Sequence, residues 1–169
     1  MRALVAGMVV LGLAVGASAR MPKFRCLTDG VRPTGKNFFV FQKNKKKLAA
    51  ALAMTESGDT SAGYPVGTIL QVLPFEAMVK RKPGFNSDGG DWEFFQLSLE
   101  QNKRGRWKTT VTAHGRAEIA NRIGSCQGCH ATLAKSHDYV CEFVIGAAGL
   151  GLTDAQLQSI QASDPRCHQ

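Results

Sequence analysis

Cys126, Cys129 and His130 are the residues whose types and spacing point most directly to chemistry, because they form the pattern Cys-x-x-Cys-His. This pattern is the attachment signal of a c-type haem. Residues i, i+3 and i+4 of a helical turn lie on one face. Both thiols can therefore form thioether bonds to one porphyrin while the imidazole reaches its iron. Ser125 stands where it can cap the start of such a turn. We therefore expect one covalent haem c, held by Cys126 and Cys129, with His130 as an iron ligand.

Three other interpretations of the same residues are less favoured. The two cysteines could form a disulfide, half of a zinc site, or a redox-active dithiol. A zinc site needs a second pair of Cys or His residues at suitable spacing, and the sequence shows none. A thioredoxin-like dithiol opens a helix after a strand in a β-α-β unit, and no such unit is recognisable.

Residues 1–19 have the composition of a secretory signal. Arg2 supplies a positive charge, residues 3–15 are an apolar run, and Ala17-Ser18-Ala19 resembles a cleavage site. The apolar run is too short to span a membrane, and no later segment is long enough. We expect a signal peptide over 1–19 and a single haem c domain over 20–169. In a bacterium the mature protein would lie in the periplasm, where disulfides persist.

The chain is basic, with a formal net charge of +8, and its positive residues are clustered. Such a surface could dock an acidic partner protein or steer small anions, although a charge run is more often a solvated face. No nucleic acid is expected as a partner of an exported protein. The clusters are Lys43 with 45–47, residues 80–82, and Lys103, Arg104, Arg106 and Lys108.

Cys26, Cys141 and Cys167 remain after the haem motif. An odd number of cysteines suggests one disulfide with a free thiol, or an intermolecular bond. We favour a pair of Cys141 with Cys167, because both follow the motif and a helix is expected between them. Cys26 is the competing partner, and the sequence leaves both pairings open.

Hydrophobic patterning predicts a mainly antiparallel β domain of the α+β class, followed by a C-terminal helical segment that carries the haem motif. In small all-helical cytochromes the motif comes early and a Met ligand follows it, whereas every Met of this chain precedes His130. The strands also argue against a four-helix bundle. The expected strands are 37–41, 68–73, 92–99 and 107–113, the last two as a hairpin. The expected helices are 45–55 after Asn44, and 154–162 with Thr153 and Gln156 as a capping box.

Several strings of the chain resemble the cytochrome P-460 family, which includes the cytochromes c′-beta. They are residues 64–68, 78–85, 90–95, 126–130 and 138–142. The resemblance implies a β-rich and often dimeric fold with one haem, thioether bonds at Cys126 and Cys129, and His130 as the proximal ligand. It further implies that the other side of the iron is open or holds water. Such an iron can bind NO or oxidise hydroxylamine.

Members of this family that oxidise hydroxylamine resemble one another in a lysine bonded to the haem edge, on a strand in the middle of the chain. The expected strand 68–73 has Gln71 but no lysine. Lys80 and Lys82 are the nearest candidates, although a lysine beside Pro83-Gly84 is more often a solvated loop residue. An activity as a hydroxylamine or NO oxidoreductase therefore depends on one of these two lysines.

His114, His137 and His168 could each supply a second iron ligand, but a lone His is more often a surface residue. The expected function is that of a periplasmic monohaem c-type cytochrome that binds NO or oxidises hydroxylamine or NO. The alternative is a simple electron carrier that docks an acidic redox partner.

Overall fold

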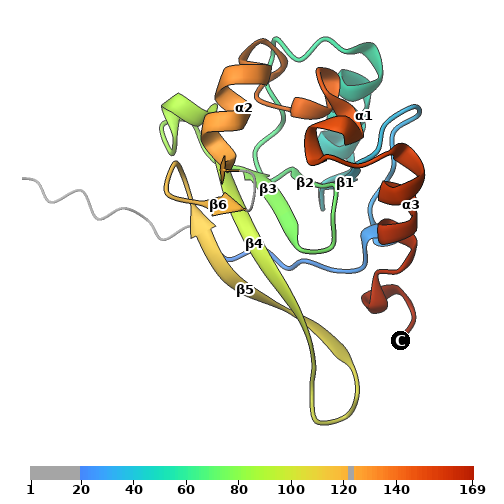
Figure 1. Ribbon diagram of the computed structural model, residues 1–169. Coiled ribbons are helices and arrows are strands. Elements are labelled where there is room, and N and C mark those ends of the chain that lie inside the picture. The colour runs from blue at the N-terminus through green and yellow to red at the C-terminus, as the bar shows by residue number, and fades with distance from the viewer. Residues whose placement is uncertain (1–19, 122–123) are drawn as a thin grey trace, which may run out of the picture.

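A computed structural model describes residues 20–121 and 124–169, so the predicted signal peptide over 1–19 lies outside the described residues. The centre of the fold is a five-stranded antiparallel sheet in the order β1-β2-β3-β4-β5 (Figure 1). A small second sheet pairs β6 with β7. The strands are β1 (Phe39–Phe41), β2 (Ile69–Gln71), β3 (Glu76–Lys80), β4 (Trp92–Gln101), β5 (Trp107–Gly115), β6 (Ala120–Asn121) and β7 (Gly124–Ser125).

Three α-helices accompany the sheet: α1 (Lys45–Ser57), α2 (Cys126–Ala134) and α3 (Asp154–Ala162). The expected α+β class with a mainly antiparallel sheet and a helical C-terminal segment is confirmed. The 3-10 turns are η1 (Leu27–Asp29), η2 (Ser87–Gly89), η3 (Lys135–His137), η4 (Cys141–Phe143), η5 (Gly146–Leu150) and η6 (Pro165–Cys167). None of the described helices has both the length and the apolar character needed to cross a membrane.

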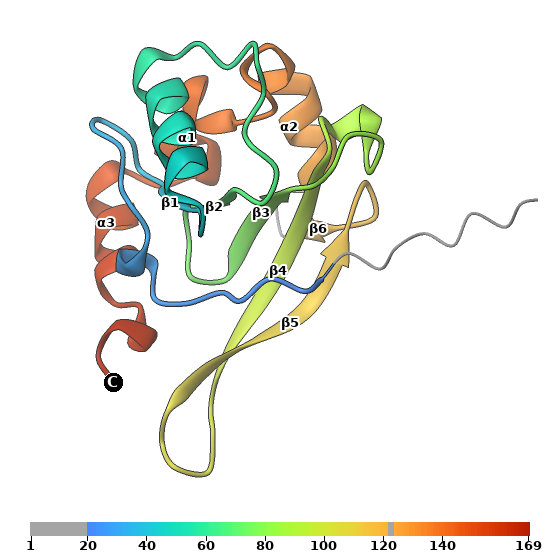
Figure 2. The ribbon, with the colours of Figure 1, turned by 180° about the vertical axis from the view of Figure 1, so that it is seen from behind.

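The alternation along β4 places its large side chains on both faces of the sheet. Trp92 and Phe94 pack in the main core beneath α1 and α2. Phe95 points to the opposite face, where Phe24 of the N-terminal segment covers it with ring centroids 5.1 Å apart. Figure 2 shows that segment, in blue, crossing β4. β4 is therefore buried on both sides near its start.

Helices α1 and α3 begin where the sequence indicates. The Asn44 side chain accepts the N–H of Lys47, and Gly58 ends α1 in the left-handed conformation with φ 74°. Thr153 and Gln156 form the predicted capping box of α3. β3 is the strand of the central sheet that the pattern misses, because its five residues, Glu-Ala-Met-Val-Lys, include two charges. Its pairing with β4 from Glu76↔Gln96 to Lys80↔Trp92 stabilises it as a strand.

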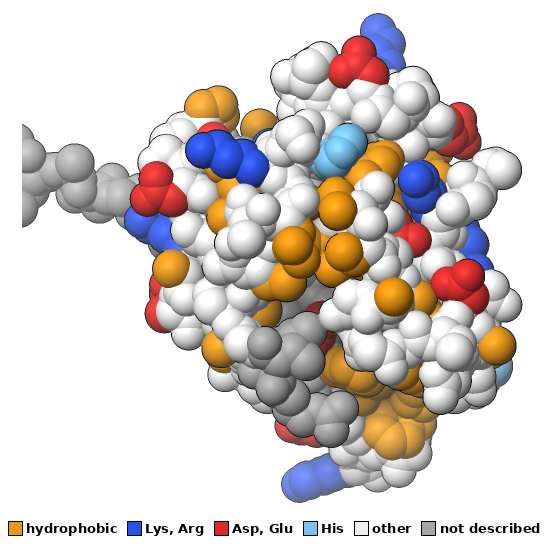
Figure 3. Space-filling view, turned by 45° about the horizontal axis from the view of Figure 1, so that its top comes forward, with side chains coloured by type: hydrophobic (Ala, Val, Ile, Leu, Met, Phe, Trp, Pro, Cys, Tyr) orange, Lys and Arg blue, Asp and Glu red, His pale blue; other side chains and the backbone are white. Residues whose placement is uncertain are grey.

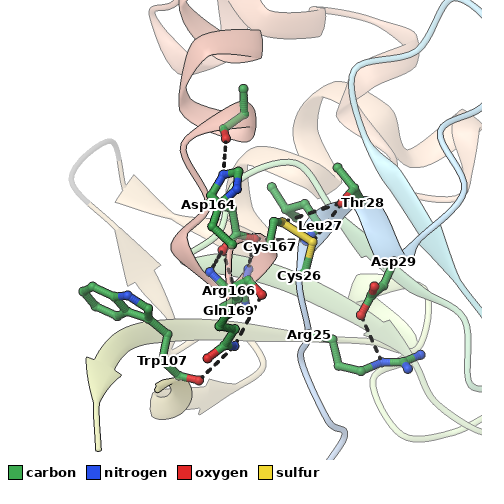
Figure 4. The surroundings of a disulfide bond; sticks show 12 residues. Arg25, Cys26, Leu27, Thr28, Asp29, Trp107, Asp164, Arg166, Cys167 and Gln169 are labelled. Carbon is green, nitrogen blue, oxygen red and sulfur yellow. Dashed lines mark hydrogen bonds and ion pairs between the residues drawn. A yellow bond between two sulfur atoms is a disulfide. The ribbon is translucent and has the colours of Figure 1, made fainter. Parts of the chain in front are cut away.

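The disulfide joins Cys26 to Cys167, so the favoured pairing of Cys141 with Cys167 is wrong. The physical reason is that η1 and η6 lie together although they are at opposite ends of the chain (Figure 4). Buried Asp164 holds them, because it accepts the backbone N–H of Leu27 at 3.0 Å and is paired with the Arg166 guanidinium at 2.8 Å. Cys141 is a free thiol in another part of the fold.

The hairpin of β4 and β5 projects from the body of the molecule (Figure 1). Its turn follows Gln101 and carries Lys103, Arg104 and Arg106, all of them exposed. One of the basic clusters of the sequence is therefore concentrated on a protruding tip.

Candidate functional site

The haem motif lies on the first turns of α2, which starts at Cys126. Ser125 caps the helix, since its hydroxyl accepts the N–H of Gly128 at 3.2 Å. The i, i+3, i+4 spacing then directs the three motif side chains to one side of the helix. Cys126, Cys129 and His130 all line the same pocket. The structure thus brings together the residues that the sequence singled out.

The pocket lies between α2, the central sheet and the segment that follows α2. Its empty space, which includes a part open to solvent, is about 930 Å³. Figure 3 shows hydrophobic side chains gathered at the end of the molecule that carries α1 and α2. The apolar lining includes Phe38, Leu70, Met78, Phe94, Val140 and Ile145.

The His130 ring is held in one orientation. Its Nδ1 lies 2.6 Å from the carbonyl oxygen of Tyr139, and its ring centroid lies 5.2 Å from that of Phe94. A carbonyl oxygen can only accept, so Nδ1 carries the hydrogen and Nε2 keeps its lone pair. Burial lowers the pKa of His130 below its ordinary value, which favours the neutral imidazole that binds metals. Nε2 is therefore the nitrogen of His130 that could bind a metal.

Cys126 does not have the character of the reactive cysteine of a redox dithiol. Burial raises the pKa of Cys126 to about 11, whereas the reactive cysteine of a redox Cys-x-x-Cys motif has a lowered pKa. Cys141 lines the same pocket, and burial beside Cys129 raises its pKa to about 12. Cys126 and Cys141 are therefore protonated thiols at neutral pH.

Cys126, Cys129 and His130 do not form a compact metal site. Among residues 20–121 and 124–169, the ligand atoms that cluster tightly enough for one ion belong to Cys26, Asp164 and Cys167, two of which form the disulfide. Two thioether bonds and one axial ligand act at different points of a large planar group, so haem c does not need the compact cluster of ligand atoms that a zinc ion needs.

The two candidate lysines lie away from the pocket wall. Lys80 is buried at the end of β3, and its Nζ lies 2.6 Å and 2.7 Å from the two carboxylate oxygens of Asp138. The same Nζ donates to the carbonyl of Gly90 at 2.7 Å. Lys82 is exposed in the following loop. Neither lysine is among the pocket-lining residues.

The other histidines have partners elsewhere in the described structure. His114 Nδ1 lies 2.7 Å from Glu93, the His137 ring stacks on Phe143, and His168 Nε2 lies 3.1 Å from the carbonyl of Ala162. None of these three lines the pocket, whereas His130 does.

Sequence reasoning missed the polar part of the pocket. Glu76, Cys141 and Glu142 are lining residues. Glu142 accepts the backbone N–H of Asn37 at 3.0 Å, and burial raises its pKa above the ordinary value. Residues 141 and 142 belong to a string that resembles the haem family, which was a usable signal. No comparable signal pointed to Glu76, because β3 was not predicted as a strand.

The arrangement can bind a planar apolar group covalently, supply it with one neutral imidazole, and keep water away from much of its surface. Two thiols, one nitrogen ligand and an apolar wall are the chemistry of haem c binding. Compared with models of protein families, with curated proteins and with solved structures, this chain matches none of them.

Proposed function

We propose that this chain is a monohaem c-type cytochrome of the cytochrome P-460 and c′-beta kind, exported to the periplasm. Cys126 and Cys129 would hold the haem through thioether bonds, and His130 would be its proximal ligand. The observation that carries the proposal is that all three side chains line one apolar pocket while the Nδ1 of His130 is engaged by a carbonyl. This leaves Nε2 as the ligating nitrogen.

A haem bound here supplies an iron that can bind small nitrogen oxides or exchange an electron. The chain's own residues orient His130, enclose the group in apolar walls, and limit access of water. The apolar part of the lining offers no hydrogen bond to a polar oxygen ligand, and the acidic side chains of Glu76 and Glu142 disfavour an anion, so a neutral diatomic ligand such as NO is favoured. Because the Lys80 amine is held by Asp138 and Gly90, we place NO binding ahead of hydroxylamine oxidation.

Electron transfer to an acidic protein is the second candidate. It is favoured by the exposed positive charges at the tip of the β4–β5 hairpin, Lys103, Arg104 and Arg106. Charges of one sign on a projecting element increase the rate at which an oppositely charged partner docks.

Optical spectra of the haem-loaded protein, ferric and ferrous, with and without NO, test the proposal. A high-spin spectrum that changes when NO is added is the expected result. A ferrous Soret band shifted far to the red would instead indicate a crosslinked haem and hydroxylamine chemistry. A low-spin spectrum that ignores NO would leave electron transfer as the function.

A further inference from the structure

The chain turns sharply after α2 and thereby brings a backbone carbonyl to His130. The N–H of Tyr139 donates to the carbonyl of Ala134 at 2.8 Å, and the carbonyl of Tyr139 then meets His130 Nδ1 at 2.6 Å. Asp138 and Tyr139 both have positive φ, at 47° and 63°. Residues with a β-carbon rarely adopt this conformation, so the turn depends on contacts with the rest of the fold.

Asp138 receives those contacts at both its side chain and its backbone. Its carboxylate oxygens lie 2.6 Å and 2.7 Å from Lys80 Nζ, and one of them also accepts the N–H of Tyr64 at 2.7 Å. Its carbonyl accepts the indole N–H of Trp92 at 2.8 Å. The side chains of Lys80 and Asp138 are only 11% and 9% exposed, so solvent screens this ion pair little.

Lys80 is itself fixed by the central sheet. It pairs with Trp92 across β3 and β4, its Nζ lies 5.0 Å from the Trp92 ring centroid, and it donates to the carbonyl of Gly90. Gly90 also confines Tyr139, because a β-carbon at this position would lie 2.3 Å from the Tyr139 ring. The turn is therefore clamped between the end of β3 and the start of β4.

From these contacts we infer that Lys80 and Asp138 are positioning residues for His130. They fix the 138–139 turn, the turn fixes the Tyr139 carbonyl, and that carbonyl selects the Nδ1–H tautomer and the orientation of the imidazole. A hydrogen bond of this kind also makes the imidazole a stronger donor to a metal. The identity of the group that Nε2 binds rests on the proposed function, whereas the tautomer of His130 does not depend on it. It gives Lys80 a role without any bond to a haem.

The first test is an NMR measurement on the full chain without haem. Two-bond ¹H–¹⁵N correlation shows which nitrogen of His130 carries the hydrogen. The wild type is expected to show the Nδ1–H tautomer. Asp138→Asn, which removes the charge but keeps an acceptor oxygen, and Lys80→Met should each produce a mixture with the Nε2–H tautomer. Lys82→Met is the matched control, since it removes the same charge from an exposed lysine two residues away and should leave the tautomer unchanged.

The second test uses the haem-loaded protein. Resonance Raman of the ferrous form reports the iron–histidine stretch, which should move to lower frequency and broaden in Asp138→Asn and Lys80→Met. Lys80→Arg, which keeps the positive charge, should recover the wild-type band in part. Where a single variant does not fold, the double variant Lys80→Met with Asp138→Asn leaves no unpaired charge in the interior and serves in its place.

The outcomes separate this inference from the proposed function. If folded variants keep the wild-type tautomer and the wild-type stretch, the positioning role is overturned while haem binding stands. If no haem attaches to the wild-type chain, the proposed function fails, and the NMR result still decides whether Lys80 and Asp138 position His130.

Discussion

Removing the Cys26–Cys167 disulfide should cost the protein a large part of its stability. The bond links residues 141 positions apart, and the chain-entropy relation for a loop of this length gives about 5 kcal/mol as the loss in the free energy of unfolding. For a domain of this size, that corresponds to a fall in the melting temperature of roughly 10–20 °C. We expect both effects in the double variant Cys26→Ser with Cys167→Ser.

The assay is thermal and urea unfolding under non-reducing conditions, with Cys141→Ser as the matched control. Cys141 is a free thiol at the pocket, so its replacement should leave the unfolding midpoint near that of the wild type. The reasoning would be refuted if the double variant melted like the wild type. It would also fail if peptide mapping of the oxidised protein found Cys141 bonded to Cys167.

Three further predictions concern the pocket. His130→Ala should keep a covalent haem but lose the normal ferric spectrum, and an unchanged spectrum would contradict the ligand assignment. Glu76 and Glu142 are the charged residues among the described pocket lining, so the haem-loaded protein should bind NO or CO and reject azide. Replacing either by Gln should raise azide affinity by on the order of tenfold, measured by optical titration. Burial raises the pKa of Glu142 from its ordinary 4.5, so the folded state binds that proton more tightly and stability falls as pH rises above about 4.5. Glu142→Gln should remove this loss in urea titrations across pH, and an unaltered pH dependence would show that the carboxyl is not responsible.

The elements that could be predicted are those with local signals. The starts of two helices are indicated by residues that can cap them, namely Asn44, Thr153 and Gln156. The large alternating side chains of 92–99 indicate a strand with two buried faces. The haem motif predicted its own arrangement, because its spacing places three side chains on one side of any helical turn.

The remaining features depend on contacts between distant parts of the chain. The pairing of Cys26 with Cys167 follows from η1 meeting η6, which no local pattern encodes. β3 becomes a strand through its ladder with β4. The role inferred for Lys80 likewise depends on its contact with Asp138, in a turn 58 residues later. From the sequence, Lys80 could be recognised only as a lysine beside a loop.

Mass spectrometry of the exported protein, under denaturing conditions and after digestion, tests the central claim most directly. The chain should be produced in a bacterium that attaches c-type haem, with Cys126→Ser and Cys129→Ser together as the matched control. We predict that the wild-type peptide containing Cys126, Cys129 and His130 carries the mass of one haem and that the control peptide carries none. A wild-type peptide with two unmodified thiols, or with these thiols joined as a disulfide, would contradict the account.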